Sequence, residues 1–176
     1  MPVQEEFGTA ARTRDRQFVL VPLGVDVRTP KKLPLCVDAS GNWSAGTRPS
    51  LNVCQTTDNQ DFTRVGDSLV LSATRAGDGE KSMCLDAGPT RKNDDPVKLQ
   101  PCAPDGQDAP SQEFVERNGK FMVRDTVGTA TPMCLDVGSK RKQGALLKIY
   151  KCVTTPNQGL QHWRGKIEVT DTIEAR

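Results

Sequence analysis

The stretch Met133-Cys134-Leu135-Asp136 places a cysteine between two apolar residues and ends in an aspartate, and the same pattern stands at residues 83–86 and 35–38. In each copy a second cysteine follows the first by 18 residues, which gives the pairs Cys36 and Cys54, Cys84 and Cys102, and Cys134 and Cys152. The first cysteines of successive copies are 48 and 50 residues apart, a spacing typical of internally repeated folds. The sequence therefore predicts three copies of one structural unit.

Two further elements recur in register with the cysteines. A glutamine, any residue and an aromatic residue follow each second cysteine, in the triplets Gln60-Asp61-Phe62, Gln112-Glu113-Phe114 and Gln161-His162-Trp163. A short apolar run precedes each copy, at 18–21, 69–72 and 121–124, and predicts a strand. Each copy thus offers four short strands, and three such units favour closure about a pseudo-threefold axis, since closure removes sheet edges. The predicted fold is all-β, a β-trefoil in which the triplets mainly supply core aromatics.

The chain length of 176 residues allows one compact domain. We expect the trefoil over 17–166, with repeats at about 17–66, 67–118 and 119–166, an N-terminal arm at 1–16 and a C-terminal tail at 167–176. The repeat favours one disulfide within each copy, Cys36–Cys54, Cys84–Cys102 and Cys134–Cys152, and the alternative is that the cysteines are buried free thiols. Three disulfides indicate an oxidising compartment, which is secreted, periplasmic, or a virion or cell surface.

Composition excludes several classes of protein. Lys and Arg total 24 against 22 Asp and Glu, which is too balanced for a nucleic-acid-binding surface. The longest uncharged apolar stretch, 18–25, is far shorter than the roughly 20 residues of a transmembrane helix, and no leader is visible at the N-terminus. The cysteines form no C-x-x-C pair, so we expect neither a metal site nor a cofactor.

The order of Cys-x-Asp, a strand ending in cysteine and Gln-x-aromatic, repeated three times, resembles the ricin B-chain type lectins, the Gln-x-Trp β-trefoils. The resemblance covers about residues 17–165. It implies that each repeat is a potential sugar pocket, built from the Asp of Cys-x-Asp, a polar residue four before the second cysteine, an aromatic residue two before it, and a nearby Asn-Gln pair. An ionised carboxylate accepts hydrogen bonds from sugar hydroxyls, while an aromatic face packs on the apolar side of the sugar ring.

The third repeat matches this pattern best. The resemblance implies that Asp136 accepts sugar hydroxyls, that Tyr150 is the stacking platform and that Lys148 fills the polar position. The carboxamides that would complete the pocket are Asn157, Gln158 and Gln161. The alternative is that Asp136 only stabilises a turn and that Tyr150 is an ordinary strand residue.

The other two repeats match less well. In the first, the matching residues are Asp38, Asn59 and Gln60, but Asn52 stands where the platform should be, so Trp43 would have to supply the aromatic face from the other side. The second keeps Asp86 but has Gln100 at the platform position, and a longer loop at 104–110, so we expect no pocket there.

Two repeats carry cations where the family usually has a carboxamide. These are Lys98 and Lys148, and the loops at 91–92 and 140–142 are also basic. We therefore state the hypothesis that the ligand is an anionic glycan, sialylated, sulfated or uronic, held partly by Lys148. The alternative is that these are solvated loops, with Asp94 and Asp95 cancelling part of the charge.

Catalysis is not expected. A glycosidase needs two carboxylates about 5 to 9.5 Å apart, whereas the pseudo-threefold axis would keep Asp38, Asp86 and Asp136 on the order of 20 Å apart. The competing class is a structural or protein-docking trefoil with degenerate pockets, part of a toxin complex or a virion or cell-surface assembly. In either class we expect a second protein subunit or larger assembly, because a single shallow sugar site binds weakly.

Overall fold

The computed structural model of the chain describes residues 17–22, 34–55, 57–75, 82–139, 141–153, 158 and 160–163. The expected arm at 1–16 and tail at 167–176 lie outside these residues. The strands of the first repeat are β1 (Gln17–Pro22), β2 (Leu35–Asp38), β3 (Ser50–Val53) and β4 (Phe62–Val65). Those of the second are β5 (Ser68–Leu71), β6 (Met83–Asp86), β7 (Lys98–Pro101) and β8 (Phe114–Arg117), and those of the third are β9 (Lys120–Val123), β10 (Met133–Asp136), β11 (Lys148–Lys151) and β12 (Leu160–Trp163).

Four short 3-10 helices join these strands in the described part of the chain. They are η1 (Asp58–Gln60), η2 (Ser72–Arg75), η3 (Pro110–Gln112) and η4 (Arg124–Thr126). No helix among the described residues has the length and apolar character needed to cross a membrane.

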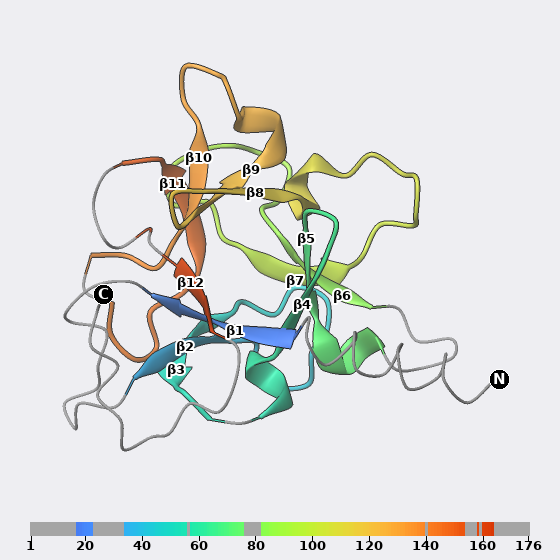
Figure 1. Cartoon of the computed structure of the whole chain (residues 1–176), viewed down its shortest axis with the longest axis vertical. Helices are drawn as coiled ribbons and strands as arrows, with labels where there is room; N and C mark the ends of the chain where they lie inside the picture. Colours follow the sequence, from blue (N-terminus) through green and yellow to red (C-terminus); the bar gives the residue numbers. More distant parts are fainter. Residues whose placement is uncertain are drawn as a thin grey trace, which may run out of the picture.

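The strands pair as three equivalent hairpins and a set of strands that connects them. Within each repeat the second and third strands form an antiparallel hairpin, β2–β3, β6–β7 and β10–β11, and Figure 1 shows these hairpins spread around the remaining strands. The last strand of each repeat pairs with the first strand of another, in the pairs β4–β5, β8–β9 and β12–β1. The resulting sheet orders are β12-β1-β4-β5-β6-β7, β11-β10-β9-β8 and β2-β3. This all-β architecture of three four-strand repeats is the expected trefoil.

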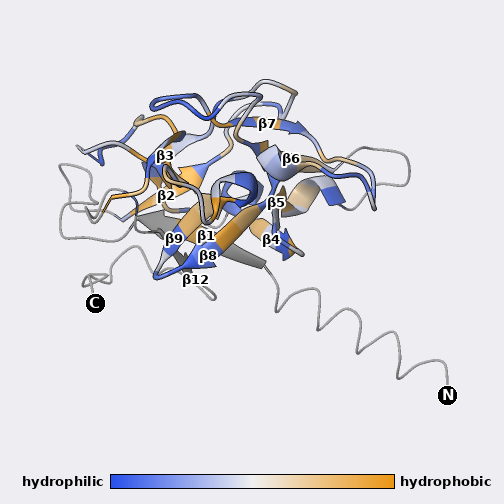
Figure 2. Cartoon of the chain, turned by 90° about the horizontal axis from the view of Figure 1, so that it is seen from above, coloured by the Kyte–Doolittle hydropathy of each residue, from blue (hydrophilic) through white to orange (hydrophobic). Residues whose placement is uncertain are grey.

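The core is built from the apolar positions of these strands. Phe62 and Phe114, the aromatic residues of the first two triplets, are fully buried together with Phe121. Each hairpin adds inward-facing aliphatic residues, such as Leu135 and Ile149 from β10 and β11. Figure 2 shows hydrophobic residues concentrated in the strands and hydrophilic residues in the peripheral loops. The side chain of Trp163, expected to join this core, lies outside the described residues.

All three expected disulfides are present. Cys36–Cys54, Cys84–Cys102 and Cys134–Cys152 join Cα atoms that are 5.0, 5.0 and 5.1 Å apart. Each one links the beginning of a hairpin's first strand to the end of its second. A closed loop of this length contributes about 3 kcal/mol in the chain-entropy model, which supplements a core with few aromatic residues.

Backbone hydrogen bonds connect the three repeats in a ring. The loop of the second repeat pairs with β11 of the third, because Asp94 N donates to Ile149 O and Ile149 N donates to Asp95 O, both at 2.9 Å. The loop of the first repeat pairs in the same way with Leu99 of β7, and the loop of the third with Leu51 of β3. Each hairpin therefore carries, along its second strand, a loop that comes from another repeat.

Candidate functional site

The third repeat holds the carboxylate of Asp136 in a buried hydrogen-bond network. Its Oδ1 accepts from the Gly138 N–H at 2.6 Å and its Oδ2 accepts from Gln158 Nε2 at 3.1 Å. Gln158 also donates to Lys151 O at 2.8 Å and accepts from the Val153 N–H at 2.7 Å. Asp136 is 1% exposed and Gln158 is fully buried. The network ties the end of β10 to the end of β11 and to the segment that precedes β12.

The first two repeats contain the same network. Asp38 accepts from the Ser40 N–H at 2.7 Å and from Gln60 Nε2 at 2.8 Å. Asp86 accepts from the Gly88 N–H at 2.7 Å and from Gln112 Nε2 at 3.0 Å. In all three repeats the carboxylate of the Cys-x-Asp aspartate therefore stabilises the turn that follows it. Each of its two oxygens accepts at least one hydrogen bond from the protein.

This comparison corrects the third triplet. Gln158, and not Gln161, makes the bonds that Gln60 and Gln112 make, so the third triplet is Gln158-Gly159-Leu160 and lacks an aromatic residue. Gln161 lies in β12, where it pairs with Val21, and its side chain lies outside the described residues. The distance from the second cysteine indicates the correct glutamine, because this glutamine follows the second cysteine by six residues in both the first and the third repeat.

Register places the remaining third-repeat candidates on the face of Asp136. Lys148 is directly opposite Asp136, and Tyr150 is opposite Cys134, two residues along the same strands. Side chains at alternate positions, and those directly opposite across a ladder, point to the same face of a sheet. Tyr150 is half-buried, and Lys148 Nζ lies 5.8 Å from the centroid of its ring. Asn157 and Lys140 lie outside the described residues.

The cation expected to face an anionic ligand has a partner within the protein. Lys148 Nζ forms an ion pair with Asp94 Oδ1, and the two side chains are 27% and 62% exposed. Asp94 belongs to the second repeat and reaches Lys148 through the ring of loops. The pair does not favour the hypothesis that Lys148 is a free cation for an acidic sugar. The sequence of the third repeat alone could not predict this ion pair, because Asp94 belongs to the second repeat.

The first repeat brings its four candidates into one network. Besides the Asp38–Gln60 bond, Trp43 Nε1 donates to Asn59 Oδ1 at 3.0 Å, and Ala39 N donates to Asn59 O at 2.8 Å. Trp43 has a positive φ of 55° and packs, half-buried, against the core. Its ring is therefore held in place, but its N–H is used within the protein.

The residue at the platform position of the first repeat also forms hydrogen bonds within the protein. Asn52 Oδ1 accepts from the Val53 N–H at 2.9 Å and from Gln143 Nε2 at 2.8 Å. Gln143 comes from the third repeat, so this contact again crosses between repeats. An amide in this arrangement offers no aromatic face to a sugar ring.

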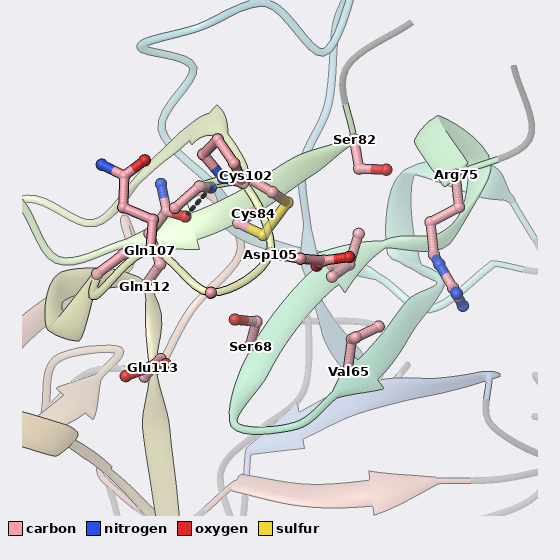
Figure 3. A pocket seen from close by; sticks show the side chains of 15 residues that line it. Val65, Ser68, Arg75, Ser82, Cys84, Cys102, Asp105, Gln107, Gln112 and Glu113 are labelled. Carbon is pink, nitrogen blue, oxygen red and sulfur yellow. Dashed lines mark hydrogen bonds between the residues drawn. A yellow bond between two sulfur atoms is a disulfide. The ribbon is translucent and has the colours of Figure 1, made fainter. Parts of the chain in front are cut away.

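The second repeat differs most. Nine residues separate Cys102 from Gln112, compared with five in each of the other repeats. This longer loop borders a cavity of about 400 Å³, whose opposite wall includes Val65 and Ser68 of the β4–β5 hairpin (Figure 3). Arg124 forms ion pairs with both Asp108 and Glu113 and so anchors the loop to the third repeat. The cavity includes Gln112 but neither Asp86 nor Gln100, so it is not the sugar pocket of the family.

Two carboxyl groups in the described part of the chain have shifted pKa values. Burial raises the pKa of Asp61 from 3.8, and the nearby Asp58 adds to the rise. Although desolvation acts in the opposite direction, the pKa of Asp95 is lowered by hydrogen bonds from Thr90 Oγ1 and the Lys92 N–H and by the charges of Lys92 and Arg91. Asp95 therefore remains a carboxylate beside β11. No group of three or more potential metal ligands occurs among the described residues.

These features define a β-trefoil of the disulfide-bonded lectin class. The ricin-type beta-trefoil lectin domain model matches residues 25–126, which is more than half of the chain. The chain belongs to this family. A comparison of the sequence with curated proteins finds no match.

Solved structures agree on the fold. The chain is similar to the designed threefold symmetric protein ThreeFoil, with a TM-score of 0.58 and 18% identity over 84% of this chain and 98% of that one. The β-trefoil lectin of the Vibrio vulnificus hemolysin/cytolysin, solved with N-acetyl-D-lactosamine, gives a TM-score of 0.61 and 15% identity over 87% and 97% of the two chains. The C-half of the earthworm R-type lectin, solved with GalNAc, gives 0.59 and 15% over 84% and 97%.

Proposed function

We propose that this protein is a non-catalytic carbohydrate-binding module that binds glycan mainly through its third repeat. The observation that carries the proposal is Tyr150, because it puts a half-buried aromatic ring on the same sheet face as the anchored carboxylate of Asp136. The equivalent positions in the other repeats are Asn52 and Gln100, which have no ring. Stacking of a ring on the apolar face of a sugar is the interaction that those repeats lack.

The sugar-binding neighbours support the ligand class. The Vibrio vulnificus domain was solved with N-acetyl-D-lactosamine and the earthworm lectin with GalNAc, and both have the fold of this chain. A single shallow pocket of this kind binds at about millimolar concentration, or about −4 kcal/mol. Useful adhesion then requires several sites, so we propose that the module acts as the adhesion part of a larger assembly. The three disulfides fit an extracellular or otherwise oxidising location.

The experiment is a glycan array of the oxidised protein beside two variants. Tyr150→Ala removes the ring from the third repeat, and Gln100→Ala removes the side chain at the equivalent position of the second repeat as a matched control. We expect Tyr150→Ala to lower binding at least tenfold and Gln100→Ala to leave it within twofold. Equal binding by the wild type and Tyr150→Ala would contradict the assignment to the third repeat.

A protein-docking scaffold is the second candidate, and the Trp43–Asn59 hydrogen bond favours it. That bond engages an aromatic ring and a carboxamide of the first repeat within the protein, as expected if these residues have a structural role. A folded protein that binds no glycan on the array would support the scaffold. The partner would then be sought by capture with the wild-type protein as bait.

A further inference from the structure

The ion pair between Lys148 and Asp94 places a carboxylate from the second repeat beside the third-repeat pocket. The backbone holds it there, because Asp94 N donates to Ile149 O and Ile149 N donates to Asp95 O, so the loop runs along β11 between Lys148 and Tyr150. Lys151 N also donates to Asn93 Oδ1 at 2.9 Å, which extends the contact to the end of the strand. Asp94 is therefore positioned by several contacts in addition to its own ion pair.

The equivalent positions in the other repeats show that the backbone does not require an aspartate here. Gly46 and Gly144 occupy the same place in the ring, with positive φ values of 89° and 84°, and Asp94 has a φ of 71°. Glycine adopts this left-handed region without steric cost, and aspartate adopts it more readily than most other residues but at some cost. Strained conformations of this kind are concentrated at functional sites. The second repeat thus keeps a carboxylate at a position where glycine is the less strained residue.

A second lysine provides an internal comparison. Lys98 stands opposite Asp86 as Lys148 stands opposite Asp136, but the loop that pairs with its strand has Gly46 in place of Asp94. Within the described residues, Lys98 has no ion pair, while Lys148 has one. Of the two equivalent lysines, the neutralised one belongs to the repeat that carries the aromatic platform.

We infer that Asp94, supplied by the second repeat, makes the third-repeat pocket selective for neutral over anionic glycans. This inference rests on the proposed function of that pocket. An acidic sugar would have to displace Asp94 from Lys148 or accept a carboxylate close to its own charge. Asp136, opposite Lys148, and Asp95, beside β11, are two further carboxylates, and the exposed cations there are Lys92 of the same loop and Lys151 at the end of β11. We therefore expect the pocket to bind anionic glycans well only when the charge of Asp94 is removed.

The experiment uses the fact that Tyr150 is the only tyrosine in the chain. Labelling with 3-fluorotyrosine gives a single ¹⁹F resonance at the candidate platform. The probes are lactose and 6'-sialyllactose, which share a disaccharide and differ by one charged sugar. They are titrated into the wild type, Asp94→Asn, Asp94→Gly and the charge-matched control Asp105→Asn, whose substitution lies in the exposed loop of the second repeat.

We expect the wild type to bind lactose more tightly than 6'-sialyllactose. Asp94→Asn and Asp94→Gly should tighten 6'-sialyllactose binding about three- to tenfold at low salt and leave lactose within about twofold, because one unit charge acts over several ångströms near the surface. The gain should shrink at high ionic strength. Asp94→Gly restores the residue of the other repeats, so it tests the charge without threatening the fold.

Three results would overturn the inference. One is equal wild-type affinity for the two probes, and another is a gain in Asp105→Asn as large as in Asp94→Asn, which would show a net-charge effect. The third is a Tyr150 resonance that responds to neither probe in any variant, which would overturn the third-repeat pocket together with the selectivity. If the wild type responds to lactose but the Asp94 variants behave identically to it, the proposed function stands and only the inference fails.

Discussion

Replacing Gln158 by alanine tests the corrected register of the third repeat. The fully buried side chain makes two bonds to backbone groups, at 2.7 and 2.8 Å, and one to the Asp136 carboxylate at 3.1 Å. Each neutral bond contributes about 1 kcal/mol and the bond to the carboxylate about 2 kcal/mol, and the Asp136 carboxylate left behind is buried. We therefore expect Gln158→Ala to lower the free energy of unfolding by about 3–5 kcal/mol.

The assay is equilibrium unfolding in urea with the disulfides intact, read as a shift of the midpoint at constant slope. Gln60→Ala is the positive control, because Gln60 makes the same three bonds in the first repeat. Gln161→Ala is the negative control. We expect it to lower the free energy of unfolding by less than about 1 kcal/mol. A large loss in Gln161→Ala with little change in Gln158→Ala would refute the assignment and restore the triplet at 161–163.

Two other predictions concern stability. Replacing both Cys84 and Cys102 by alanine should cost about 3 kcal/mol of unfolding free energy, measured against the wild type by denaturant titration, and an unchanged midpoint would count against a loop-closure contribution. Asp61→Asn should stabilise the protein at pH 7, because burial raises the pKa of Asp61 above 3.8 and its ionised form therefore opposes folding. That gain should disappear as the pH falls below 3.8, where the carboxyl group is protonated in both states, and a gain that persists there would exclude the charge as its cause.

The cysteine spacing predicted the repeats and the disulfide pairing, because covalent links at a constant separation of 18 residues are a local property of each copy. The fold followed when the triplets and apolar runs that recur in register were added. The third triplet was misassigned because two glutamines, Gln158 and Gln161, stand three residues apart and only the second is followed by an aromatic residue. Hydrogen bonding to Asp136 distinguishes them, and that bond depends on the three-dimensional position of the segment before β12. The distance from the second cysteine therefore predicts the triplet's glutamine better than a following aromatic residue does.

The contacts between repeats were beyond sequence reasoning for a physical reason. A sequence motif groups the residues of one repeat, but the ring of loops brings a side chain from another repeat to the platform strand. Gln143 of the third repeat bonds Asn52 of the first, and Asp94 of the second pairs with Lys148 of the third. The candidate pockets of the first and third repeats are therefore each shared by two repeats.

Because side chains are shared between repeats, a repeat without a pocket of its own can still contribute to the pocket of another. The second repeat lacks a platform of its own, yet its loop supplies the carboxylate that lies on Lys148. The second repeat therefore contributes a side chain to the candidate pocket of the third, although it has Gln100 and no ring at its own platform position. Conversely, adding an aromatic residue at Asn52 would not by itself build a pocket, because the loop that carries Gln143 already contacts that position. The ring couples each hairpin to a loop from a different repeat, so the surroundings of the three candidate sites differ.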